Sequence, residues 1–144
     1  LFNHESPRRG ETFLTRKVTR GIARILAGLD EKIYLGNLDA KRDWGYAPEY
    51  VEAMWKMLQM KKPDDYVIAT GRSESLEYFI DKVFSQFALN SQDHVTTSAD
   101  LMRPTDLSAI YAEPSKAHNI LDWKARFNVD DVVRLMVDSA DINA

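Results

Sequence analysis

Short apolar runs alternate with longer amphipathic stretches along this chain, and the alternation limits the folds open to it. Residues 33–35 and 66–69 have the β-branched and aromatic composition of short strands, and residues 1–3 resemble a strand end. Apolar side chains recur at helical spacing in residues 13–29, 46–60, 73–87, 116–121 and 129–137. We therefore predict an α/β fold, with 94–97 as a weaker strand candidate and few strong strands for a complete doubly wound sheet.

Local signals mark the ends of several predicted helices. Gly28 suits the end of the first helix, and Pro48 suits the first turn of the second, where its missing N–H is not needed. Ser73, followed by acids in the next turn, predicts an N-cap. The helix in residues 46–60 is apolar on a broad face, so we expect it to be deeply packed.

The densest group of polar side chains lies in residues 36–46, between a predicted strand and a predicted helix. It contains a glycine turn, an amide, two cations, two aspartates and an aromatic residue. We predict an irregular strand-to-helix junction here, a position where α/β proteins place ligand-contacting loops. A second polar stretch, residues 3–10, follows the first strand.

Composition excludes several classes of function. The 144 residues suffice for one domain, and a net charge of −3 argues against a general nucleic-acid binder. Without cysteine there is no disulfide and no thiolate metal site, and the three histidines are too dispersed for a metal motif. No apolar run reaches the roughly 18 residues of a membrane span. Because the chain opens on a strand end and has no initiator methionine, we expect upstream sequence.

Catalytic motifs are absent from the sequence, but cations stand in its predicted loops. There is no phosphate-binding glycine fingerprint, no G-x-S-x-G elbow and no nucleophile–base pair. Four loop arginines could bind phosphate oxygens with their planar forks: Arg8, Arg9, Arg42 and Arg103. They could equally be solvated, or paired with Glu5, Glu11, Asp39 and Asp43.

Other polar residues have two readings. Asn3 and His4 stand at the carboxyl end of a strand, where open α/β sheets bind ligands, but they could also cap the following loop. Asn37 is by default a turn residue, and Asp106 could cap a helical turn. The three tryptophans, Trp44, Trp55 and Trp123, are typical of core and corner positions.

Two long motifs resemble a known family. Residues 3–13 (Asn-His-Glu-Ser-Pro-Arg-Arg-Gly-Glu-Thr-Phe) and 35–45 (Leu-Gly-Asn-Leu-Asp-Ala-Lys-Arg-Asp-Trp-Gly) are similar to those of GDP-mannose 4,6-dehydratases, extended short-chain dehydrogenases/reductases. Looser similarity covers residues 15–17, 49–55, 66–71, 103–105 and 114–117. The resemblance implies a cytoplasmic, NADP-dependent lyase that converts GDP-mannose to GDP-4-keto-6-deoxymannose in GDP-fucose biosynthesis, usually as a dimer or tetramer.

The same resemblance implies that this chain is the carboxyl-terminal part of an NAD(P)-binding, Rossmann-like fold. The family's glycine-rich cofactor loop, Thr and Glu catalytic pair and Tyr-x-x-x-Lys motif would lie upstream, so we expect no catalytic residue here and no activity of the chain alone. Residues 11–38 and 71–144 would form the smaller sugar-nucleotide domain, and 1–10 and 39–70 would complete the cofactor domain. Apolar faces in residues 46–69 would then need the missing amino-terminal half as a partner.

The resemblance also assigns ligand contacts. It assigns NADP to His4 and Arg9, and the sugar nucleotide to Asn3, Lys17, Leu35, Gly36, Asn37, Arg42, Arg103 and Asp106. Lys17 and Arg42 would flank the diphosphate, and residues 35–37 would face guanine. Asp106 stands where a glutamate is expected on the ribose, and Asp122 replaces an expected glycine before Trp123. No metal is implied.

Two other readings stay open. One is a related nucleotide-sugar epimerase or reductase of the same superfamily, against which the stretch at residues 3–10 favours the dehydratase. The other is a non-catalytic nucleotide-binding or interaction module that lacks a cofactor half by nature.

Overall fold

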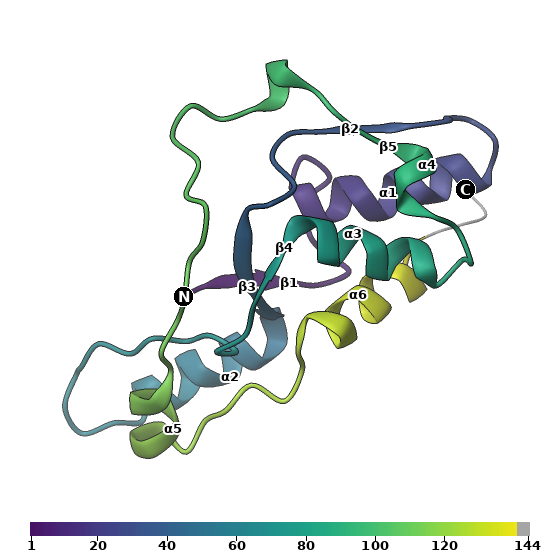
Figure 1. Cartoon of the computed structure of the whole chain (residues 1–144). Helices are drawn as coiled ribbons and strands as arrows, with labels where there is room; N and C mark the ends of the chain where they lie inside the picture. The colour runs from purple at the N-terminus through teal and green to yellow at the C-terminus, as the bar shows by residue number, and fades with distance from the viewer. Residues whose placement is uncertain (141–144) are drawn as a thin grey trace.

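The computed structural model describes residues 1–140, in which two small sheets pack against helices, with the sheet of residues 33–35 and 95–97 along the top edge in Figure 1. One sheet has the order β1-β3-β4, formed by Asn3–Glu5, Lys41–Tyr46 and Ser73–Ser75. The other pairs β2, Ile33–Leu35, with β5, Val95–Thr97. Pairing is parallel in β1–β3 and β2–β5 and antiparallel in β3–β4. The helices are α1 (Leu14–Leu26), α2 (Ala47–Leu58), α3 (Leu76–Ser85), α4 (Ser91–His94), α5 (Ser115–Leu121) and α6 (Val129–Asp138), with a 3₁₀ turn, η1, at Ala99–Leu101.

Most of the predicted elements are confirmed, with shifted ends. The strand at 33–35 and the weaker candidate at 94–97 form β2 and β5, and the five predicted helices form α1, α2, α3, α5 and α6. Gly28, at φ +70°, lies just after α1, in the left-handed conformation that glycine adopts without a steric penalty. His94, the first residue of the strand candidate at 94–97, instead ends α4, and β5 begins one residue later.

The N-cap prediction for Ser73 is wrong. Ser73 begins β4, and the cap of α3 is Ser75, whose Oγ accepts a hydrogen bond from the Tyr78 backbone N–H at 3.0 Å. The serine pair offers two capping positions, and pairing of residues 73–75 with β3 fixes the second as the helix start.

The strand predicted at 66–69 is not formed within the described residues. Ile68 and Ala69 are buried, and the Phe2 N–H donates to the Ile68 carbonyl at 3.0 Å. One backbone bond aligns this extended segment beside the start of the chain but does not make a ladder. The burial was therefore predictable, whereas a strand also needs a paired neighbour along its length, which residues 66–69 do not have within residues 1–140.

The junction predicted at residues 36–46 is the largest correction. Only its first part is a turn, because residues 41–46 form β3, the central strand of the larger sheet. Trp44 packs in the main core with its ring 5.4 Å from that of Phe79. Strand pairing on both sides outweighs the polar composition that suggested an irregular loop.

Asp43 is a fully buried carboxylate on β3 that joins this strand to the turn at residues 70–71. Its oxygens accept hydrogen bonds from the backbone N–H and hydroxyl of Thr70, at 3.0 and 2.8 Å, and from the Gly71 N–H at 2.7 Å. A buried carboxylate is stable only with such partners. The polar residue that looked like part of a ligand loop is therefore an internal brace.

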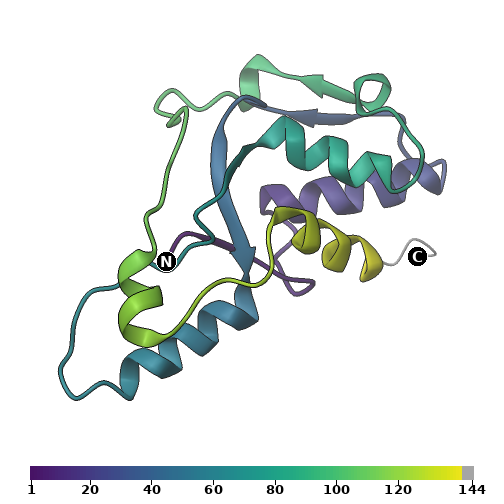
Figure 2. The same cartoon turned by 60° about the horizontal axis from the view of Figure 1, so that its bottom comes forward.

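Two apolar clusters occupy the interior. Figure 1 and Figure 2 show α1, α3 and α6 side by side at the first cluster, and α2 beside α5 at the second. The first packs α1, α3 and α6 against β2 and β3, and it contains Ile22, Phe79 and Met136. The second joins α2 to α5 through Tyr50 and Trp123, whose rings meet edge to face at 5.8 Å. Gly45 allows this second contact, because a Cβ there would lie 2.4 Å from the Tyr50 ring.

One side of α2 is exposed, contrary to the expected deep packing. Val51, Met54, Trp55 and Leu58 recur at helical spacing, and 61% of Trp55 and 82% of Leu58 are exposed. Trp44 and Trp123 are buried as expected, so the core assignment is wrong for Trp55 alone among the three tryptophans.

Replacing Asp43 with alanine should strongly destabilise the protein. The change removes the acceptor of three part-buried donor groups on Thr70 and Gly71, so we expect a loss of about 1–3 kcal/mol in the free energy of unfolding, measured by denaturant titration. Asp39→Asn is the matched control, because Asp39 is exposed on the same connection. Equal stability of the two variants would contradict the bracing role of Asp43.

Candidate functional site

The first group of predicted site residues lies on and after β1. His4 forms a 2.8 Å hydrogen bond through Nδ1 to the Phe2 carbonyl, and its ring is 5.2 Å from that of Tyr50. Asn3 is exposed and lies opposite Trp44 in the β1–β3 register. Arg9 places its guanidinium 3.7 Å from the centre of the Phe13 ring.

A buried acid, Glu5, holds this group in place. Its carboxylate accepts a 2.6 Å hydrogen bond from the Thr15 hydroxyl and pairs with the Arg9 guanidinium at 3.2 Å. Burial raises the pKa of Glu5 above its ordinary value of 4.5, while Thr15 and Arg9 oppose the shift. The sequence indicated Glu5 only as a possible partner of an arginine. Strand alternation would place Glu5 on the same face as the exposed Asn3, so no local signal indicated its burial.

The second group surrounds the carboxyl end of β2. Lys17 on α1 reaches across to donate from Nζ to the Tyr34 carbonyl at 2.8 Å. Leu35 is buried, and Asn37 accepts a hydrogen bond from the Asp39 N–H, as expected of a turn residue. Gly36 lies so close to η1 that a Cβ would be 2.4 Å from the Leu101 carbonyl oxygen.

A strap formed by residues 98–110 connects this end of β2 with β3. At one end, the Ser98 N–H donates to the Leu35 carbonyl at 2.8 Å. At the other, the Lys41 N–H donates to the Ser108 carbonyl at 2.8 Å, and the Ile110 N–H donates back to Lys41 at 3.2 Å. The strap follows the left side of the molecule in Figure 1 between β5 and α5.

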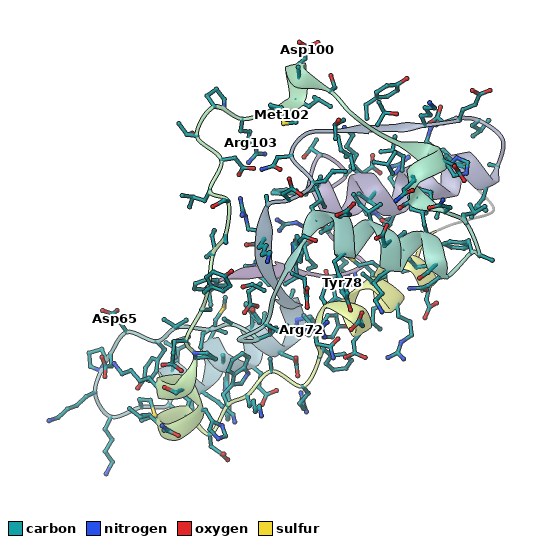
Figure 3. All side chains as sticks on the ribbon, viewed as in Figure 1. Asp65, Arg72, Tyr78, Asp100, Met102 and Arg103 are labelled. Atoms are coloured by element: carbon teal, nitrogen blue, oxygen red, sulfur yellow. The ribbon has the colours of Figure 1, made fainter. Side chains whose placement is uncertain are left out.

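Arg42 and Asp106, 64 positions apart in the sequence, meet at the strap. The guanidinium donates to an Asp106 carboxylate oxygen at 2.7 Å and to the carbonyls of Leu107 and Lys41, both at 2.8 Å. Arg103 lies on the strap just after Met102 (Figure 3) and is exposed. Nothing in the sequence pattern indicated the Arg42–Asp106 pair.

The two groups of site residues are linked through β3. Asn3 and His4 pair with Trp44 and Gly45, two or three positions along the strand from Arg42. Strand pairing thus joins the β1 residues to the strand that carries Arg42, and Lys17 on α1 is joined to the end of β2 through Tyr34. This arrangement suits a ligand with several phosphate oxygens better than a metal, and residues 1–140 contain no cluster of three potential metal ligands.

A surface pocket of about 230 Å³ lies between Thr70 and α5, and none of the ten predicted contact residues lines it. None of the described helices combines the length and apolar character needed to cross a bilayer.

Comparison with known proteins decides the family. A family model described as GDP-mannose 4,6 dehydratase matches residues 1–136. The chain belongs to the GDP-mannose 4,6 dehydratase family. GDP-mannose 4,6 dehydratase 1 of Arabidopsis thaliana is 51% identical over 138 residues, which cover 96% of this chain. The human GDP-mannose 4,6 dehydratase is 44% identical over 154 residues, covering 95% of this chain.

The chain spans 38% of the length of the Arabidopsis dehydratase and 41% of the length of the human dehydratase. Solved structures agree in fold. RMD from Pseudomonas aeruginosa, complexed with NADPH, superposes with a TM-score of 0.86 at 17% identity, over 99% of this chain and 47% of that one. The dTDP-glucose 4,6-dehydratase of Bacillus anthracis, in complex with NAD, superposes with a TM-score of 0.82 at 16% sequence identity, over 99% of this chain and 43% of that one. The fold is therefore that of part of an NAD(P)-binding extended short-chain dehydrogenase.

One departure from the family's expected pattern can be placed in the structure. Asp122, where a glycine was expected, takes a left-handed φ of +48° after α5, and the buried Trp123 follows it. Aspartate tolerates this conformation better than most residues, so the turn forms without glycine.

Glu5 should make stability depend on pH. A raised pKa in the folded state means that this group's contribution is fully present below about pH 4.5 and declines as the pH rises through the raised value. Glu5→Gln keeps an acceptor for Thr15 but does not titrate. The melting temperature of this variant, relative to that of wild type, should therefore rise as the pH increases from 4.5 to neutrality. The exposed Glu11→Gln serves as control, and parallel pH curves for Glu5→Gln and wild type would contradict the account.

Proposed function

We propose that the complete protein is an NADP-dependent lyase that converts GDP-mannose to GDP-4-keto-6-deoxymannose. The match of residues 1–136 to the GDP-mannose 4,6 dehydratase family carries this proposal. In this account the protein acts in the cytoplasm, in GDP-fucose biosynthesis, as a dimer or tetramer. This chain contributes ligand contacts, and the catalytic groups lie in the rest of the polypeptide.

The sugar nucleotide would bind along the end of β2 and the strap. Lys17 and Arg42 would hold the diphosphate, Leu35, Gly36 and Asn37 would face guanine, and Arg103 and Asp106 would reach the second phosphate or the ribose. The geometry supports this, since Arg42 uses three of its five N–H groups within the chain and retains two for an oxyanion. Asn3 would contact the ligand between the hexose and the diphosphate.

NADP would contact His4 and Arg9. His4 uses Nδ1 on the Phe2 carbonyl, which leaves Nε2 for a ligand. Arg9 is held through its Nε side by Glu5 and by the Phe13 ring, and its remaining N–H groups suit a phosphate. These residues fit one part of the dinucleotide, which supplies reversible hydride acceptance when bound.

We also propose that the chain contributes to two domains of the complete protein. Residues 11–38 and 71–144 would form the sugar-nucleotide domain, and 1–10 and 39–70 would join the cofactor domain. The exposed stripe of α2, formed by Val51, Met54, Trp55 and Leu58, would pack against the amino-terminal half. The relatives' greater length supports this occupant, because the chain spans only 38–41% of them.

Turnover tests the proposed function directly. The complete protein with NADP should convert GDP-mannose to a 4-keto product, detected by mass spectrometry, whereas residues 1–144 alone should not. Conversion of UDP- or dTDP-sugars with no reaction of GDP-mannose would instead support a related epimerase or reductase.

Arg42→Ala should weaken binding of GDP to the complete protein. Loss of a charge-assisted contact costs about 1.5–3 kcal/mol of binding free energy, measurable by calorimetry. Arg24→Ala is a matched control, because Arg24 forms an exposed pair with Asp30 away from the strap. Unchanged GDP affinity in Arg42→Ala would exclude the diphosphate role.

Leu58→Glu should destabilise the complete protein if the α2 stripe is an internal interface. Burying a charge in place of a leucine at a packed interface should lower the melting temperature by several degrees. Leu29→Glu provides the control, since Leu29 is also exposed but lies after α1, outside the stripe. Equal melting temperatures for the two variants would argue that the stripe faces solvent.

A further inference from the structure

We propose that the Arg42–Asp106 ion pair is a latch that holds the strap, residues 98–110, over the candidate site and neutralises Arg42 until an anionic ligand arrives. The proposal rests on the proposed function for the identity of that ligand, a nucleoside diphosphate. It assigns Asp106 a positioning role that acts through Arg42, in addition to any contact with a ribose.

The first observation is how the strap is held. Its ends are fixed by backbone hydrogen bonds to Leu35 and Lys41. Between them, residues 102–107 have one backbone bond within the segment, from the Asp106 N–H to the Arg103 carbonyl at 3.3 Å. Among the hydrogen bonds of residues 1–140, those that tie this middle part to the body come from Arg42 alone.

The second observation is that the middle of the strap has little packing of its own. Residues 102–105 and Leu107 are exposed, whereas Asp106 turns inward, with 20% of its side chain accessible. A segment with few buried contacts opens at a low free-energy cost once its tie is removed. The contacts of the Arg42 guanidinium therefore control the position of the strap and, with it, the position of Arg103.

The third observation is the charge balance. Arg42 and Asp106 are four-fifths buried and in direct contact, so the carboxylate offsets most of the attraction that Arg42 would exert on a phosphate. An arriving diphosphate must share or replace this carboxylate. Binding would then loosen the strap or draw it onto the ligand, which couples the strap's position to occupancy of the site.

Hydrogen–deuterium exchange of the complete protein tests the mechanical part without any ligand. Asp106→Asn keeps the shape and a neutral acceptor but removes the charge, so amides of residues 102–107 should exchange about fivefold faster, the equivalent of about 1 kcal/mol. Asp100→Asn is the matched control, because Asp100 lies exposed on the same strap (Figure 3). Exchange that is equal in both variants and wild type would overturn the latch.

Titration with inorganic pyrophosphate tests the charge balance. Asp106→Asn should bind pyrophosphate about two- to fivefold more tightly than wild type and than Asp100→Asn, since Arg42 loses its counter-ion. Unchanged or weaker pyrophosphate binding by Asp106→Asn would contradict the proposal and leave Asp106 as a ribose contact only. If the wild-type protein bound no GDP, the proposed function would fail, while the exchange experiment would still decide the latch.

Discussion

The buried carboxylate of Asp43 is the interaction on which the rest of the fold depends. It sits at the middle of β3, the strand that pairs with β1 on one side and β4 on the other, and it ties that strand to the turn at residues 70–71. Because β3 also carries Arg42 and runs into α2, this brace helps to fix both the strap contact and the direction of α2. Displacing Asp43 would move both regions.

Buried acids perform similar work elsewhere in the chain. Glu5 joins β1 to α1 through Thr15 and Arg9, and Glu49 accepts hydrogen bonds from the backbone N–H groups of Arg126 and Phe127. Each carboxylate binds a neighbouring segment, the one after β1 or the one before α6, that forms no strand pairing. The loops that carry the candidate site are thus held by internal hydrogen bonds as well as by apolar packing, which keeps their polar side chains in a defined arrangement.

Local patterns predicted much of the fold. The apolar periodicity of α3 and α6 was readable because their faces contact the core of this same chain. It failed where the outcome depends on distant partners: residues 41–46 became a strand through pairing with both β1 and β4, and Trp55 on α2 is exposed. In the candidate site, the turn role of Asn37 followed from its sequence context, whereas the Arg42–Asp106 contact joins residues 64 positions apart and leaves no local signal.

A structure of the complete protein with GDP bound would test the central claim most directly, namely that the end of β2, β3 and the strap form a nucleoside-diphosphate site in a GDP-mannose 4,6 dehydratase. The account predicts phosphate oxygens within hydrogen-bonding distance of Lys17 and Arg42, with guanine beside Gly36 and Asn37. GDP bound elsewhere, with the Arg42 guanidinium and the strap untouched by it, would contradict the account.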